Sequence, residues 1–154
     1  MRILVLSDSH RDEFTLKLAI KSQPSADVVV FLGDGEDDFD NSRNLIRTPR
    51  VYAVKGNNDW YSALPQSQII EAGGVRIYLT HGHGEAVKYG TGVLLDKVKR
   101  YDCTLGLYGH THEAKYEYFD GIHLFCPGSI LHGDYGVVDI TDKGIMCINM
   151  KCNL

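Results

Sequence analysis

The sequence predicts an α/β protein in which two mixed β-sheets pack as a sandwich flanked by helices. Three observations support this prediction. The first half alternates apolar runs with a helical pattern, the second half pairs apolar runs around tight turns, and five apolar runs end in residues that commonly bind metals. The 154 residues are expected to form a single domain over 1–154, because that length can bury a core without disulfides.

The first half reads as β-α-β units. Residues 2–7 form a near-continuous apolar run, as expected of a strand that is buried on both faces. Residues 13–22 carry apolar side chains in an imperfectly amphipathic pattern that predicts a helix, and Pro24 follows as a stop signal. Residues 28–32 and 51–54 predict the second and third buried strands.

The second half contains three hairpin signals. Gly73-Gly74 and Asp120-Gly121 are two-residue turns between apolar runs, and a third turn contains Asp142-Lys143-Gly144. The paired runs are residues 68–71 with 75–79, 116–119 with 122–125, and 137–140 with 145–149. One more strand is expected over 104–108 and one helix over 93–100. We therefore expect an antiparallel second half to meet a parallel first half.

Composition narrows the class of protein. The net charge of −4 implies no general affinity for nucleic acid or membranes, and no basic patch accompanies an aromatic stacking platform. No apolar run approaches the length of a membrane span. The four cysteines show no C-x-x-C spacing, which favours reduced thiols in a cytoplasmic protein. The acidic residues within 36–40 are interpreted as a solvated loop.

Five short segments follow predicted strands and carry metal-binding residue types. They are Asp8-Ser9-His10, Gly33-Asp34, Gly56-Asn57-Asn58-Asp59, His81-Gly82-His83 and Gly109-His110-Thr111-His112. Ligands in open α/β sheets bind at the carboxyl ends of strands, and histidine is the commonest metal-binding side chain. Each motif is weak alone, but together they indicate a metal site. His123 and His132 lack this context and are expected to be structural.

Several of these residues also have an ordinary structural interpretation. Asp8 and His10 are two positions apart, so an extended backbone projects both to one side, where they could hold one cation. Asp34 fits either a turn that caps backbone amides or a carboxylate that bridges two metals. Asn57 fits either a turn residue or an oxygen ligand for a hard metal.

The order of the five motifs resembles the calcineurin-like metallophosphoesterases. The resemblance is closest to small bacterial and archaeal phosphodiesterases, which also resemble the 29-kilodalton subunit of eukaryotic retromer. It extends from Asp8 to the turn at Pro127-Gly128-Ser129, and it implies a four-layer fold in agreement with the predicted sandwich. It implies that one metal is bound by Asp8, His10 and His112, that a second is bound by Asn57, His81 and His110, and that Asp34 bridges the two.

The resemblance also implies a function. It predicts a metal-dependent phosphoesterase, with phosphodiesters favoured over monoesters, acting on a small phosphate-ester substrate. Two divalent ions are implied, manganese foremost, with iron, nickel, zinc or magnesium also compatible. Two carboxylates offset only half the charge of two such ions, so the site stays attractive to phosphate. The ions would lower the pKa of a bridging water, so that hydroxide attacks the phosphorus.

Two departures from the family pattern bear on the chemistry. Many relatives place a histidine directly after the metal-binding asparagine, where it protonates the leaving group, but here that position is Asn58, followed by Asp59. An amide can donate a hydrogen bond to phosphate but cannot act as a general acid. His83 is the other candidate for a phosphate contact, with a solvent-facing loop histidine as the alternative. Cys126, where the subfamily often has asparagine, is interpreted as a small buried residue.

The alternative function is a catalytically weak, protein-binding scaffold of the same fold that has lost part of the metal site. The presence of all seven expected ligand types argues against it. A nuclease is disfavoured by the charge and by the missing aromatic platform. Association into a homo-oligomer is left open. The chain has no insertion large enough for a cap domain, so the site is expected to be open.

Overall fold

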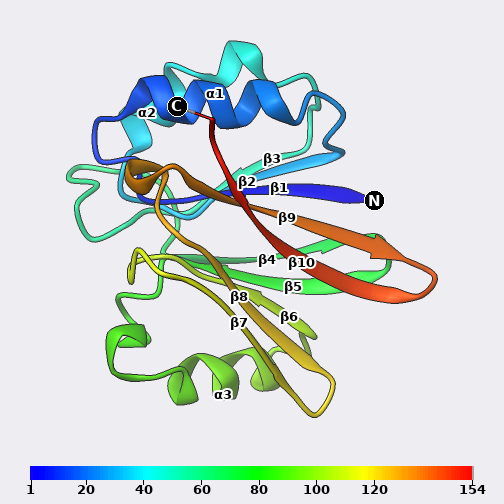
Figure 1. Ribbon diagram of the computed structural model, residues 1–154. Coiled ribbons are helices and arrows are strands. Elements are labelled where there is room, and N and C mark those ends of the chain that lie inside the picture. Colours follow the sequence, from blue (N-terminus) through cyan, green and yellow to red (C-terminus); the bar gives the residue numbers. More distant parts are fainter. Residues whose placement is uncertain (154) are drawn as a thin grey trace.

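The computed structural model describes residues 1–153 and contains two five-stranded sheets that pack face to face (Figure 1). The first sheet has the order β10 (Gly144–Lys151), β9 (Asp134–Thr141), β1 (Arg2–Leu6), β2 (Val28–Phe31) and β3 (Val51–Ala53). The second has the order β4 (Ser67–Ala72), β5 (Val75–Thr80), β6 (Leu105–Leu107), β8 (Ile122–Pro127) and β7 (Ala114–Phe119). The predicted fold class is confirmed.

The expected split between a parallel and an antiparallel half of the chain is wrong. β1, β2 and β3 are parallel as predicted, but the β9–β10 hairpin returns to this first sheet and pairs antiparallel with β1. In the second sheet β5, β6 and β8 run parallel, and only the edge strands β4 and β7 are antiparallel. Residues 81–104, which connect β5 to β6 and include a helix, are long enough for the crossover that a parallel pair requires. Both sheets therefore combine parallel and antiparallel pairs.

Strand β1 shows why its sequence is apolar throughout. Ile3 and Val5 pack into the cluster between the two sheets, whereas Leu4 and Leu6 pack into the cluster beneath the first helix. All four side chains are at most 1% exposed. Because successive residues of a strand point to opposite faces, burial on both faces removes the polar alternation.

Helices cover the outer faces of both sheets (Figure 1). Helix α1 (Glu13–Ser22) packs on the first sheet, and α3 (Gly92–Arg100) packs on the second. Three 3₁₀ turns complete the helical elements: η1 (Arg43–Leu45), η2 (Val87–Tyr89) and η3 (Ile130–His132). Within residues 1–153, no helix combines the length and apolar character that crossing a membrane would require.

The acidic segment forms a short helix and not the expected solvated loop. Helix α2 (Glu36–Asp40) has three of its four acidic residues in its first turn, where negative charge is favourable at the helix N-terminus. Asp38 is buried, and its Oδ2 accepts hydrogen bonds from Ser9 Oγ (2.6 Å) and the Arg11 amide (2.9 Å). Asp38 therefore fixes the segment that carries His10.

Cys126 confirms the interpretation of a small buried residue. Its side chain is inaccessible to solvent, and this burial raises the pKa of its thiol to about 11. The thiol therefore stays protonated at neutral pH, so it is a poor nucleophile and a poor metal ligand.

Candidate metal centre

Six of the seven expected metal ligands lie together, in loops that follow strands from both sheets. The loop after β1 carries Asp8 and His10, and the loop after β2 carries Asp34. From the second sheet, the loops after β5 and β6 contribute His81, His110 and His112. These residues form two groups, Asp8 with His10 and His112, and Asp34 with His81 and His110, and the ligand atoms within each group lie within 4.8 Å of one another.

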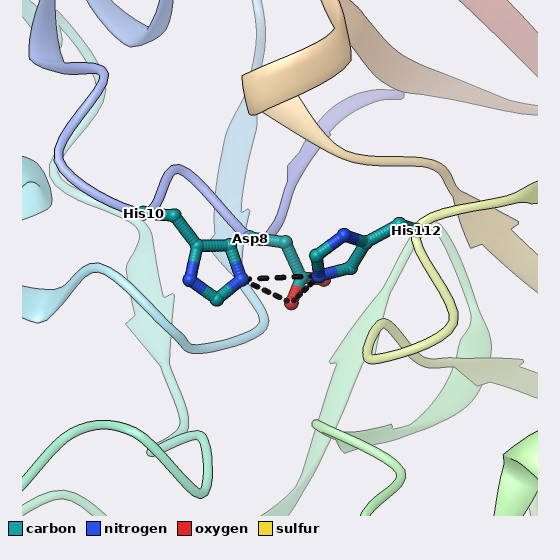
Figure 2. A group of neighbouring side chains, drawn as sticks. All are labelled: Asp8, His10 and His112. Atoms are coloured by element: carbon teal, nitrogen blue, oxygen red, sulfur yellow. Dashed lines mark hydrogen bonds and ion pairs between the residues drawn. The ribbon is translucent and has the colours of Figure 1, made fainter.

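In the first group both imidazoles face the Asp8 carboxylate (Figure 2). Asp8 Oδ1 lies 3.5 Å from His10 Nε2 and 3.3 Å from His112 Nε2, and these two nitrogens are 3.0 Å apart. Asp8 Oδ2 accepts hydrogen bonds from Ser7 Oγ and the His110 amide. Oδ1 is buried and has no hydrogen-bond partner within residues 1–153. A buried carboxylate oxygen without a partner is costly, and a cation between the three side chains would satisfy it.

In the second group a hydrogen bond fixes the orientation of the His81 ring. Its Nδ1 donates to the carbonyl oxygen of Leu32 at 2.7 Å, so Nε2 is the nitrogen that a metal would take up. Burial disfavours the charged imidazole, but the Asp34 and Asp8 carboxylates raise the pKa of His81. Its Nε2 lies 3.3 Å from Asp34 Oδ2 and 3.2 Å from His110 Nδ1. Asp34 Oδ2 is also 3.6 Å from His10 Nε2, so Asp34 lies between the two groups, where a bridging carboxylate would have to be.

The carboxylates and imidazoles of this cluster shift one another's pKa values. Burial by itself would raise the pKa of Asp8, but His10, His112 and His81 hold that pKa well below its usual range. Asp8 in turn raises the pKa of His10. Burial and the neighbouring positive groups, His81 first, lower the pKa of His110 to about 4. His110 is therefore neutral at pH 7, which is the form that binds a metal.

The backbone of these loops is unusual. Left-handed conformations are uncommon for residues other than glycine and cluster at functional sites. Five of the seven expected ligands adopt them: Asp8 (φ 56°), His10 (43°), Asp34 (61°), His110 (75°) and His112 (63°). The surrounding structure must hold these conformations in place. It therefore also holds the side chains in fixed positions.

Two glycines in the motifs are required by close packing around the carboxylates. A Cβ atom at Gly56 would lie 2.1 Å from Asp34 Oδ1, and one at Gly109 would lie 2.1 Å from Ser7 Oγ and 2.8 Å from Asp8 Oδ2. No side chain fits at either position without displacing a carboxylate. These glycines therefore set the positions of Asp34 and Asp8.

The other three expected site residues lie at the margin of the cluster. Asn57 is exposed and lines the same hollow as His81 and His83. Asn58 donates from its backbone amide (2.8 Å) and its side-chain Nδ2 (2.9 Å) to the two oxygens of Asp34. The His83 ring is exposed and lies edge-on to His110, with 5.1 Å between centroids. Asn58 thus orients Asp34, while Asn57 and His83 are open to an incoming ligand.

Asp59 has an organising role that the sequence reading missed. Its carboxylate accepts four backbone N–H groups, those of Asp34 (2.8 Å), Gly35 (2.9 Å), Glu36 (3.0 Å) and Gly56 (2.7 Å). It therefore joins the loop after β2 to the loop after β3. A weak signal for this role is present locally, since an acidic residue that ends a Gly-Asn-Asn turn often caps backbone amides.

Replacing Asp59 with alanine is expected to lower the free energy of unfolding by about 2–4 kcal/mol, because several N–H groups lose their acceptor. For a chain of this size, that corresponds to a melting temperature about 5–15 °C lower. Thermal unfolding without added metal would measure the change, with the exposed Asp37→Ala as the control. A shift no larger than that of Asp37→Ala would show that water replaces the carboxylate.

The two histidines expected to be structural lie in different surroundings. His123 Nδ1 is 2.7 Å from the Tyr116 hydroxyl, at the β7–β8 hairpin. The ring of His132 lies edge-on to that of His112, with 5.7 Å between centroids. His132 therefore borders the first group, although it belongs to neither ligand group.

Comparison with known proteins places this geometry in a family. A model of the calcineurin-like phosphoesterase superfamily domain matches residues 1–143. A probable metallophosphoesterase of Mycoplasma pneumoniae is 31% identical over 134 residues, covering 84% of this chain and 79% of the relative. A phosphodiesterase of Methanocaldococcus jannaschii is 26% identical over 144 residues, covering 83% of both chains.

Solved structures share the fold. A predicted phosphoesterase of Streptococcus pneumoniae superposes with a TM-score of 0.83 at 25% identity, covering 97% of this chain and 88% of the other. Vps29 of Entamoeba histolytica, solved as a complex with zinc, superposes with a TM-score of 0.75 at 22% identity, covering 99% of this chain and all of the other. At that identity the second likeness concerns the fold alone.

Proposed function

Because the chain belongs to the calcineurin-like phosphoesterase superfamily, we propose that it hydrolyses phosphodiesters with the help of two divalent metal ions. The observation that supports this most strongly is the buried oxygen of Asp8, which has no hydrogen-bond partner and faces two imidazole nitrogens. The second support is Asp34, which lies between the two ligand groups. The donor set fits two cations, because each group combines one carboxylate with two histidines.

The proposed ligands follow the two groups. Asp8, His10 and His112 would hold one ion, His81, His110 and Asn57 the other, and Asp34 would contact both. Imidazole and carboxylate ligands suit manganese, which we take as the first choice, and also iron, nickel, zinc or magnesium. When bound, two such ions supply positive charge to a phosphate and lower the pKa of a water molecule.

The chain's own residues would position the substrate and keep the ligands in place. The imidazoles of His10 and His112 are 25% and 31% exposed, whereas that of His81 is only 3% exposed. The phosphate would therefore arrive over His10 and His112. Asn58 keeps Asp34 in place through two hydrogen bonds, and Leu32 does the same for His81. His83, exposed beside His110, would contact a phosphate oxygen.

Two separate hollows that border the cluster support a diester substrate. One is lined by Asn57, His81 and His83, and the other by His10, Asn58 and the exposed Trp60. A phosphodiester carries two organic groups, and each hollow could take one. The similarity to a phosphodiesterase from M. jannaschii agrees with this preference.

Metal stoichiometry tests the proposal directly. Chelator-treated protein titrated with Mn²⁺ in a calorimeter is expected to bind two ions per chain and to gain hydrolysis of bis(p-nitrophenyl) phosphate. His112→Ala should bind one ion fewer, because it removes one of three ligands of the first group. His123→Ala, which lies at the β7–β8 hairpin, is the matched control and should bind two. If the protein binds no metal at saturating Mn²⁺, the proposed enzymatic function is ruled out.

The alternative is a protein-binding scaffold of the same fold, and the fold shared with Vps29 over 99% of the chain is compatible with it. The same titration separates the two functions. A scaffold would give little or no turnover on any phosphodiester, even with both metals bound.

A further inference from the structure

The hollow that Asn57, His81 and His83 line is a small cavity beside the second ligand group. Its wall contains a buried charged residue that phosphate hydrolysis does not require. The cavity has a volume of about 130 Å³ and is bordered by His81 and His83. Away from these histidines its wall includes Lys55, Gln66, Tyr78, Thr80, Glu85 and Lys97. Because His81 belongs to both, a group held in this cavity would be adjacent to a phosphate at the cluster.

Glu85 is the unusual residue in this wall. It is 3% exposed, and burying a carboxylate is costly unless partners stabilise it. Its Oε1 accepts a hydrogen bond from Thr80 Oγ1 (2.9 Å), and its Oε2 accepts one from the Tyr78 hydroxyl (3.2 Å). A carboxylate can accept about four hydrogen bonds. Thr80, Tyr78 and Lys97 are its three donors. The Glu85 carboxylate can therefore accept one more hydrogen bond.

Lys97 of helix α3 places an ammonium group beside that carboxylate. Its Nζ lies 3.4 Å from Glu85 Oε2, and its side chain is 33% exposed. An ammonium has three donors, so at least one is left for a ligand in the cavity. The pair thus presents an acceptor and a donor side by side, and its two charges offset each other.

This wall suits a neutral group that both donates and accepts hydrogen bonds. Hydroxyl groups do both, and two vicinal hydroxyls match an adjacent acceptor and donor. A cation would be repelled by Lys97 and by Lys55, which also borders the cavity. At the Glu85–Lys97 pair, the Glu85 carboxylate disfavours an anion. Pockets that enclose drug-sized ligands measure about 300–1,000 Å³, so this cavity takes a smaller group.

We propose that this cavity binds a small alcohol with vicinal hydroxyl groups as one ester group of the substrate. Glu85 accepts a hydrogen bond from one hydroxyl, and Lys97 donates one to the other. The inference rests on the proposed phosphoesterase function, since the phosphate at the metals places the alcohol in the cavity. It assigns Glu85 and Lys97 to specificity for the alcohol and not to the chemical step.

Two non-hydrolysable phosphonates test the inference. 3,4-Dihydroxybutylphosphonate and butylphosphonate differ only in two hydroxyl groups, and calorimetry on Mn²⁺-loaded protein measures both. The diol is expected to bind at least about tenfold more tightly, which corresponds to about 1.4 kcal/mol. Lys97→Gln should reduce this ratio to less than about threefold without weakening butylphosphonate. Lys99→Gln, exposed on the same helix, should retain the full ratio.

Glu85→Gln gives a second, independent variant, checked first for an unchanged melting temperature. It should also lose the preference for the diol, because the amide is a weaker acceptor and leaves Lys97 unneutralised. Equal binding of the two phosphonates by the native protein would overturn the inference. Tighter binding of 3-carboxypropylphosphonate than of the diol would overturn it too, because the lysines would then select an anion.

The phosphoesterase function is measured separately, by hydrolysis of bis(p-nitrophenyl) phosphate, which lacks hydroxyl groups. A diol preference in a protein without turnover would contradict the function and retain the cavity assignment. Turnover without a diol preference would contradict the cavity assignment alone.

Discussion

Replacing Asp34 with asparagine is expected to lower kcat/KM for bis(p-nitrophenyl) phosphate by on the order of 10²–10³-fold. Asp34 Oδ2 faces His81 on one side and His10 on the other, so this carboxylate is the proposed ligand of both ions. An amide carries no charge and offers only one acceptor oxygen. Each ion would therefore be held less tightly, and less positive charge would act on the phosphate.

The fold should survive this change, because the cores between and outside the sheets contain no ligand residue. The melting temperature without metal is expected to stay close to that of the native protein, while the stabilisation by added Mn²⁺ should shrink. Asp40→Asn makes the same chemical change at an exposed residue of α2 and serves as the control. Near-normal turnover of Asp34→Asn at saturating metal would show that Asp34 is not the bridge.

The rate of hydrolysis is expected to fall steeply as the pKa of the leaving alcohol rises. A general acid typically accelerates such a step by about 10²–10⁴-fold, and Asn58 cannot supply the proton. The structure strengthens this expectation, since the Asn58 side chain is already bonded to Asp34. Diesters with activated aryl groups should be cleaved far faster than alkyl diesters. A series of diesters with graded leaving groups measures the slope.

Introducing the histidine that many relatives have is not expected to repair this deficiency. Asp59 follows directly in the sequence and is the residue that could pair with a histidine at position 58. In the structure, the Asp59 carboxylate already accepts hydrogen bonds from four backbone amides. The substitution would also remove the hydrogen bond that the Asn58 side chain donates to Asp34. Selective acceleration of poor leaving groups by Asn58→His would contradict this account.

A shallow dependence in the native protein would mean that another group donates the proton. His83 is the candidate, because it is exposed beside His110 and borders a hollow at the cluster. His83→Ala would then steepen the dependence, whereas an unchanged slope would leave His83 with a binding role alone.

The sequence by itself determined the layers and singled out the carboxylates and histidines that the fold brings together. Burial of strands on both faces produces unbroken apolar runs, and tight turns need glycine, so both are visible locally. Helix α1 begins and ends where its pattern predicted. The clustering of the six carboxylate and histidine residues could be predicted because each follows a strand, and strand ends meet at one edge of a sheet.

Only the tertiary structure decided which strands pair and which side chains are already engaged in hydrogen bonds. The β9–β10 hairpin belongs to the first sheet because β9 pairs with β1. The two strands lie far apart in the chain, so no local sequence pattern predicts this pairing. The engagement of Asp59 by amides of two loops, and of Asn58 by Asp34, likewise depends on segments more than twenty residues apart. Residue type shows what a side chain can bind, but only the folded chain shows whether that capacity is still free. Hydrogen bonds between distant segments form or fail according to the position of both partners.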